Sequence, residues 1–175
     1  NWAGHIILSI LNSILPSFIA EIGLLILSLL GLPYAFRELI KAVNKDNIYM
    51  GYCIFPFTYS FLFLLGFYNF SIALSILLFA ISFWIKHENF PITTKSALFF
   101  CGLLALTFFS HILVFALLVA LLGLKVVFYL INERLLSIQT SPTITQSSWV
   151  KMSMLLITCS LGLLLYLYFF YPWEN

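Results

Sequence analysis

The stretch FFSHILVF, residues 108–115, places a Ser-His pair in the middle of a long apolar segment. Residues 96–131 contain only one charged residue, Lys125. As a single straight helix this segment would extend about 54 Å, whereas the hydrocarbon core of a bilayer is about 30 Å thick. The sequence therefore predicts two membrane spans, residues 96–110 and 112–131, joined by a tight turn at the Ser-His pair.

The composition indicates a protein whose solvent is lipid. Of the 175 residues, 63% are hydrophobic and only 8% are charged, whereas a soluble domain carries about 25% charged residues. A surface in contact with water cannot be built from so few charges. The apolar runs do not alternate with polar residues at a period of two, as the strands of a membrane β-barrel would. We therefore expect one all-α, polytopic membrane domain over residues 1–175.

The N-terminal segment, residues 1–17, is shorter than the later apolar runs and is amphipathic. Its apolar residues follow helical spacing: Ile6, Ile7, Ile10, Leu11, Ile14 and Leu15. Polar residues occupy the opposite face of the same helix, and Trp2 suits the level of the lipid headgroups. The pattern predicts an N-terminal interfacial amphipathic helix that lies in the outer interface and ends at Pro16.

Six segments are predicted to be transmembrane helices. They are residues 18–36, 48–66, 70–85, 96–110, 112–131 and 150–171. Pro56 is expected to kink the second of them. Six spans place every basic residue on one side of the membrane: Arg37, Lys41, Lys45, Lys86, Lys95, Lys125, Arg134 and Lys151. The positive-inside rule makes that side cytoplasmic.

The opposite, outer face gathers four candidate substrate-binding residues: His111, His5, Glu21 and Asn69. Polar and ionisable groups at membrane depth are costly, so each is a candidate functional residue. Each also has a structural interpretation. His111 can bond carbonyl groups at a helix end, and Glu21 can interact with the dipole of a helix that Ser17 caps and in whose first turn Glu21 lies. His5 can simply be solvated, and Asn69 can cap a loop.

No motif in the sequence identifies a catalytic residue, a metal site or a cofactor. Cys-x-x-Cys, His-Glu-x-x-His and glycine-rich phosphate loops are absent, and the only Asp, Asp46, lies on the cytoplasmic side. The cysteines Cys53, Cys101 and Cys159 lie inside apolar runs, where they are expected to act as small hydrophobic residues. The small net charge of +2 gives no indication of nucleic-acid binding.

Several stretches occur in a characteristic order. An interfacial stretch, NWAGHIILSILN, leads into a span that ends YAFRELIKAV. FPFTYSFLFLLGFYNFSIALSILLFAISFWIK follows, and then a helix that contains FFSHILVFALLVALL. This order resembles the integral-membrane glycosyltransferases of the GT-C type, especially their uncharacterised bacterial members. The resemblance covers roughly residues 1–131, and GFYNF and the Ser-His pair are its most suggestive motifs.

The resemblance implies a glycosyltransferase core that uses a polyprenyl-phosphate-linked sugar on the outer side of a bacterial inner membrane. It would place residues 1–17 in the later part of an outer loop, with His5, Glu21, Asn69 and His111 bordering a cavity above the membrane. The family's catalytic Asp has no counterpart here. A catalytic acid would therefore lie upstream, in a longer protein of which this chain is expected to be a fragment. The outer face also lacks the Arg or Lys with which members hold the carrier phosphate.

Two other functions are alternatives. The chain can be a non-catalytic integral membrane subunit that packs against other membrane subunits in a larger assembly. It can also be half of a transporter, a class that favours broken helices and polar groups at mid-membrane. Pro56 is the main candidate break and the ionisable groups lie near span ends, so the transporter ranks last. An upstream span followed by an acidic residue in an outer loop would favour the enzyme.

Overall fold

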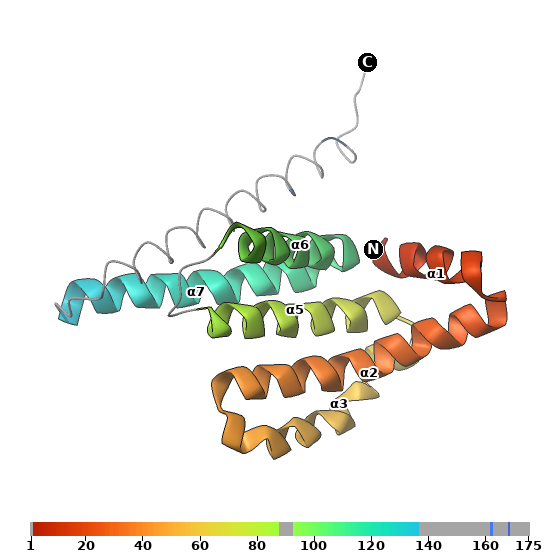
Figure 1. Ribbon diagram of the computed structural model, residues 1–175, viewed down its shortest axis with the longest axis horizontal. Helices are drawn as coiled ribbons and strands as arrows, with labels where there is room; N and C mark the ends of the chain where they lie inside the picture. The colour runs from red at the N-terminus through yellow and green to blue at the C-terminus, as the bar shows by residue number, and fades with distance from the viewer. Residues whose placement is uncertain (1, 88–92, 137–161, 163–167, 169–175) are drawn as a thin grey trace.

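The structure is a computed structural model that describes residues 2–87 and 93–136, together with Gly162 and Tyr168. Every regular element in this described part is a helix, as Figure 1 shows, so the predicted all-α class is confirmed. The longer helices are α1 (Ala3–Ile14), α2 (Ser17–Val43), α5 (Tyr68–Lys86), α6 (Thr94–Ser110) and α7 (Ile112–Leu136). The predicted span over residues 150–171 lies outside the described residues except at Gly162 and Tyr168.

Successive segments run back and forth along a common direction, with α5 in the middle of the bundle (Figure 1). α2 packs along one side of α5, and α6 and α7 pack along the other. α1 begins beside the C-terminal end of α6 (Figure 1). The chain then reverses, and the first part of α2 packs against α1. The C-terminal ends of α1 and α6 therefore lie toward one end of the bundle, and the C-terminal ends of α2 and α5 lie toward the other.

The main hydrophobic core lies where α5, α6 and α7 meet. All three helices contribute side chains to it, and its fully buried members include Ala73, Ala80, Phe100, Leu104 and Leu118. The α2–α5 contact is also made by small residues, because Gly31 of α2 faces Ser75 of α5. A Cβ atom at position 31 would lie 3.1 Å from the Ser75 Oγ. Small residues at helix contacts are typical of packing between membrane helices.

The buried polar residues of the described part are all Ser or Thr: Ser28, Thr58, Ser71, Ser75, Ser82, Thr107 and Ser110. Most of these hydroxyls are satisfied within their own helices. The Thr107 Oγ1 donates to the Leu103 carbonyl at 2.8 Å, and the Ser110 Oγ donates to the Leu106 carbonyl at 2.7 Å. Large apolar side chains lie on the outside instead, among them Phe18, Leu98, Leu113, Leu124 and Phe128, each at least 67% exposed.

Two helices, α2 and α5, are long and apolar enough to cross a membrane, judged by length and composition. α6 and the described apolar part of α7, Ile112–Phe128, are shorter apolar helices. The turn predicted from the length of residues 96–131 is confirmed, because α6 ends at Ser110 and α7 begins at Ile112. The number of segments that cross a membrane stays a prediction.

The spanning helix predicted over residues 48–66 does not form. The chain there consists of η1 (Lys45–Ile54), a 3-10 helix, followed by two single-turn helices, α3 (Phe55–Thr58) and α4 (Phe61–Leu64). Pro56 does not kink a helix. It lies in the first turn of α3, where the missing N–H would have no partner inside the helix.

The break in this segment lies at Tyr59 and Ser60, beyond the proline. Ser60 caps α4, and its Oγ accepts a hydrogen bond from the Phe63 N–H at 3.3 Å. Gly66 then adopts a φ of +83°, a conformation that favours glycine, and the chain turns into α5. These breaks explain why an apolar run of spanning length forms short helices.

α1 is confirmed as a separate short helix that ends before Pro16, since Leu15 is extended at φ −122° and ψ 152°. One part of this helix packs on the bundle and another part is exposed. Ile7 and Leu8 pack on the smaller core between α2 and α5, whose members are Leu24, Ile72 and Ile76. Three residues of the predicted apolar face, Ile6, Ile10 and Ile14, are exposed. The orientation of α1 relative to a membrane stays a prediction.

Candidate functional site

The N-terminal end of α1 is hydrogen-bonded to the end of α6 and to the start of α5. The backbone N–H of Trp2 donates to the Phe109 carbonyl at 2.9 Å. The backbone N–H of Gly4 donates to the Asn69 Oδ1 at 2.6 Å. We call the five residues Trp2, Gly4, Asn69, Phe109 and His111 the three-helix junction. It contains two of the four candidate substrate-binding residues.

Asn69 has a structural role at this junction. The first N–H groups of a helix have no partner within it, and the Asn69 amide oxygen supplies one for Gly4. The site leaves no room for a larger residue, because a Cβ atom at position 4 would overlap the Asn69 side chain. Asn69 was expected to cap a loop. Its side chain instead accepts from an N–H of α1, which is 65 residues away along the chain.

His111 closes the turn between α6 and α7. Its N–H donates to the Thr107 carbonyl at 2.9 Å, and its carbonyl accepts from the Phe115 N–H at 3.0 Å. The half-buried ring meets Phe70 edge-on, with 5.3 Å between centroids. Its Nδ1 is buried and has no hydrogen-bond partner among the described residues. Burial lowers the pKa of His111 below its ordinary value of 6.5, so the imidazole is neutral at pH 7.

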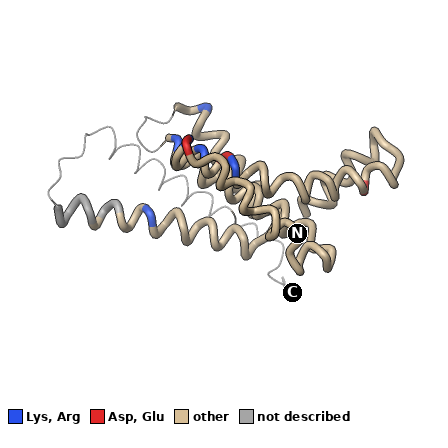
Figure 2. The backbone as a smooth tube through the Cα atoms, turned by 90° about the horizontal axis from the view of Figure 1, so that it is seen from below, with Lys and Arg blue, Asp and Glu red and all other residues tan. Residues whose placement is uncertain are grey.

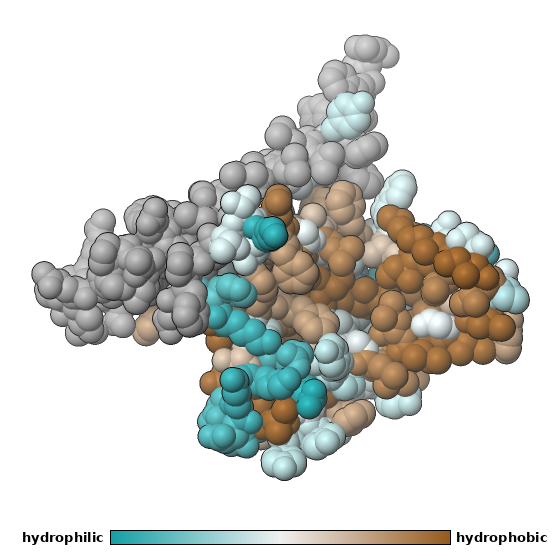
Figure 3. All heavy atoms as spheres, viewed as in Figure 1, coloured by the Kyte–Doolittle hydropathy of each residue, from teal (hydrophilic) through white to brown (hydrophobic). Residues whose placement is uncertain are grey.

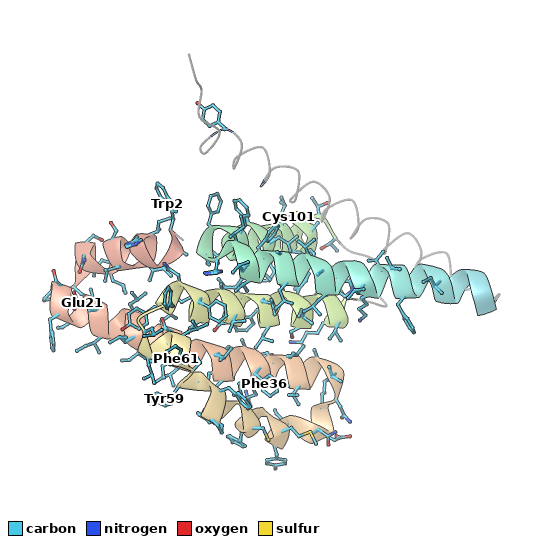
Figure 4. All side chains as sticks on the ribbon, turned by 180° about the vertical axis from the view of Figure 1, so that it is seen from behind. Trp2, Glu21, Phe36, Tyr59, Phe61 and Cys101 are labelled. Carbon is cyan, nitrogen blue, oxygen red and sulfur yellow. The ribbon has the colours of Figure 1, made fainter. Side chains whose placement is uncertain are left out.

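His5 and Glu21 do not join this arrangement. The side chain of His5 is exposed on α1, and that of Glu21 is exposed on α2. Figure 4 shows Glu21 at the far end of the α1–α2 hairpin from Trp2. The structure therefore brings together Asn69 and His111, which contacts Phe70, the residue after Asn69. It does not bring the four predicted residues around one cavity.

The dipole interpretation of Glu21 requires a correction. Ser17 is the first residue of α2 and not its cap; the cap position is Pro16, and no side chain makes a capping bond there. The Pro16 carbonyl accepts from the N–H groups of Ile19 and Ala20 at 2.9 and 3.0 Å. Glu21 therefore lies beyond the first turn, where the influence of the helix dipole fades.

The opposite end of the bundle carries a charged cluster that the sequence did not indicate. Glu38 accepts hydrogen bonds from Lys41 Nζ and Lys86 Nζ, each at 3.1 Å, and Arg37 Nη1 lies 3.9 Å away. We call these four residues the Glu38 cluster. The spacing of Glu38 and Lys41 within one helix suggests an ion pair, but Lys86 is 48 residues away along the chain. Figure 2 shows most of the described Lys and Arg positions of the backbone at this end.

A pocket of about 400 Å³ lies beside the Glu38 cluster. Its lining includes Phe79 and Ser82 of α5, Tyr34 of α2 and Phe99 of α6. Lys86 and Glu38 supply its charged part. The Ser82 Oγ donates to the Glu38 carbonyl at 3.0 Å and so joins α5 to α2 at the pocket.

No group of three or more His, Cys, Asp or Glu side chains that could hold a metal ion occurs among the described residues. Cys53 is exposed and Cys101 is half-buried, both as free thiols, and Cys159 lies outside the described residues. The sequence prediction of no metal site and no cofactor is not tested by this result.

No family model, curated protein or solved structure matches this chain. The resemblance to GT-C glycosyltransferases therefore rests on the order of the sequence features alone.

Proposed function

We propose that the chain is an integral membrane domain, a helical bundle whose outer surface contacts lipid. The observation that supports this most directly is the distribution of polarity. Ser and Thr hydroxyls and small residues lie between helices, while many large apolar side chains, such as Phe18 and Leu98, are exposed. A soluble protein rarely exposes so much continuous apolar surface, whereas membrane helices associate through small residues and hydroxyls.

The proposed orientation places the Glu38 cluster on the cytoplasmic side, in a bacterial inner membrane. Lys and Arg of the described part gather toward the end of the bundle where α2 and α5 end (Figure 2). The three-helix junction lies toward the opposite end and contains no Lys or Arg. Such asymmetry is the signature of the positive-inside rule. Arg134 and Lys151 also belong to this prediction, but their side chains lie outside the described residues.

Extraction and labelling test the proposal. The chain should stay with the membrane during alkaline carbonate extraction. In a variant without native cysteines, Asn12→Cys should react with an impermeant thiol reagent in intact cells, because Asn12 is exposed on α1. Asn47→Cys, exposed on η1, is the matched control and should react only after permeabilisation. Release by carbonate, or the reverse labelling pattern, would contradict the proposal.

The more specific proposal is a glycosyltransferase core that uses a polyprenyl-phosphate-linked sugar on the outer side. It is supported by the order of sequence features over residues 1–131 and by the junction that gathers Asn69 and His111 toward the predicted outer end. His111 is the ionisable side chain of this junction, and its ring is only half-buried.

The competing proposal is a non-catalytic membrane subunit. It is supported by the structural contacts of Asn69 and by the position of Glu21 away from the junction. The His111→Ala variant of the full-length protein separates the two. If the enzyme proposal holds, sugar transfer should fall at least about tenfold in a protein that still folds, a loss of about 1.4 kcal/mol in transition-state stabilisation. Unchanged transfer per folded molecule would remove His111 from the site.

A further inference from the structure

The Glu38 cluster has more positive than negative charge. Three cations, Arg37, Lys41 and Lys86, surround one carboxylate, which leaves a net charge of +2. The Glu38 side chain is only 16% exposed, whereas the three basic side chains are 40 to 50% exposed. An ammonium group has three N–H donors, so Lys41 and Lys86 can each bind Glu38 and a second anion at once.

The pocket beside this cluster is amphipathic. Phe79 and Phe99 contribute apolar surface, and Tyr34 and Phe99 of its lining are more than half exposed. Lys86 and Glu38 are the charged residues of its lining. Figure 3 shows hydrophilic side chains on this part of the surface directly beside hydrophobic ones. A ligand that fills the pocket therefore needs an anionic group next to an apolar body.

We propose that this pocket binds an anionic phospholipid, with the phosphate at Lys86 and the glycerol and first acyl carbons between Tyr34 and Phe99. The proposal rests on the membrane location proposed above. α2 and α5, which carry Tyr34 and Lys86, are the two helices long and apolar enough to cross a membrane. Basic side chains where helices leave the cytoplasmic leaflet attract its anionic lipids.

A free phosphate ion shares the anionic chemistry of a lipid headgroup but lacks the apolar part. An inorganic anion would leave the aromatic walls of the pocket without a partner. A zwitterionic phospholipid would bring its own positive charge toward a cluster in which three cations already outnumber one carboxylate. The pocket should therefore prefer an anionic phospholipid to both.

The experiment is native mass spectrometry of the full chain, purified in detergent, freed of lipid and titrated separately with phosphatidylglycerol and phosphatidylcholine. We expect phosphatidylglycerol to bind more tightly. Lys86→Gln should weaken its binding by about fivefold, the effect of one lysine near an anionic lipid surface. Lys86→Arg should retain the binding, because it keeps the charge. Glu38→Gln should strengthen it, because one negative charge beside Lys86 is removed.

The matched control is Lys45→Gln, which removes an exposed lysine at the same end of the bundle but outside the pocket. It should leave the lipid preference unchanged. Inorganic phosphate at the concentration of the lipid should not displace phosphatidylglycerol. Equal affinity for the two lipids, displacement by phosphate, or equal losses in Lys86→Gln and Lys45→Gln would overturn the proposal.

The outcome is distinguishable from failure of the membrane proposal. A chain that carbonate releases from membranes is not integral, whatever lipid it binds. A chain that resists carbonate and binds both lipids equally is an integral membrane protein without the anionic lipid site.

Discussion

The backbone N–H of Gly4 is hydrogen-bonded to the side-chain oxygen of Asn69 at 2.6 Å, across 65 residues of sequence. This bond joins the first turn of α1 to the first turn of α5. Together with the bond from the Trp2 N–H to the Phe109 carbonyl, it sets where α1 begins relative to the bundle. The position of α1 is therefore determined at its N-terminal end by specific hydrogen bonds, and along its length by the apolar contacts of Ile7 and Leu8.

Replacing Gly4 with alanine should destabilise the protein. The new Cβ atom would overlap the Asn69 side chain, so the hydrogen bond must break and leave a half-buried N–H unsatisfied, at a cost of about 1–3 kcal/mol. Thermal unfolding in detergent measures the loss. Gly102→Ala is the matched control, because nothing lies within 4 Å of its Cβ position; it should be neutral or stabilise by up to about 1 kcal/mol. Equal unfolding temperatures for Gly4→Ala and wild type would contradict this account of the junction.

Replacing Pro56 with alanine should change stability little, by less than about 1 kcal/mol. Pro56 lies in the first turn of α3, where its fixed φ angle suits the helix and its missing N–H has no partner within α3. A proline in the middle of a spanning helix would behave differently, because alanine would restore a backbone hydrogen bond and straighten the helix. Thermal unfolding and helical content by circular dichroism measure both effects. A clear gain in helical content in Pro56→Ala would favour the span that the sequence predicted over residues 48–66.

The length of an apolar segment and the position of a proline made parts of the fold predictable from the sequence. The turn at Ser110 and His111 follows from a segment too long for one span, and the end of α1 follows from Pro16. Residues 48–66 were mispredicted because apolar composition is the same in a spanning helix and in short helices that pack on a neighbour. The breaks there depend on the cap that Ser60 provides and on the positive φ of Gly66. A single serine or glycine within a run of aromatic residues is a weak indication that a helix ends.

The candidate site was less predictable than the fold. Sequence reasoning placed four polar residues on one face by topology alone, and topology does not say which side chains meet. Asn69 is engaged by Gly4 and Glu21 is remote from the junction. The Glu38 cluster was missed because its Lys86 lies 48 residues from Glu38, and only the packing of α2 on α5 brings them together.

His111 should make stability depend on pH. Burial lowers its pKa in the folded protein, while the unfolded chain keeps the ordinary value of about 6.5. Below that value the unfolded state binds a proton that the folded state does not. Stability is therefore complete above about pH 6.5 and is lost as the pH falls toward and through the lowered pKa.

The unfolding temperature at pH 7.5 and at pH 5.5, compared between wild type and His111→Gln, measures this dependence. The wild type should lose more stability on acidification than His111→Gln, whose side chain does not titrate. His5→Gln removes an exposed histidine from α1 and serves as the control, which should keep the wild-type difference. A His111→Gln protein as sensitive to pH as wild type would show that the buried ring does not couple folding to protonation.

The contact between α2 and α5 should be sensitive to the size of residue 31. A Cβ atom at Gly31 would lie 3.1 Å from the Ser75 Oγ and 3.6 Å from its Cβ, so Gly31→Ala requires a small shift and Gly31→Leu a separation of the helices. Overpacking of this kind costs about 1–3 kcal/mol. Unfolding temperatures should therefore fall in the order wild type, Gly31→Ala, Gly31→Leu. Gly102→Leu, with open space around position 102, should change stability much less.

A compensating change gives the sharper test of this contact. Ser75→Gly removes the atoms that a Cβ at position 31 would meet, so the double variant Gly31→Ala/Ser75→Gly should lose less stability than the sum of its single variants. Residues in direct contact typically show coupling of about 0.5–3 kcal/mol in such a cycle. Strict additivity would show that the two helices do not meet at these residues. Because Lys86 and Glu38 also come together through the α2–α5 contact, additivity would remove the structural basis of the phospholipid pocket as well.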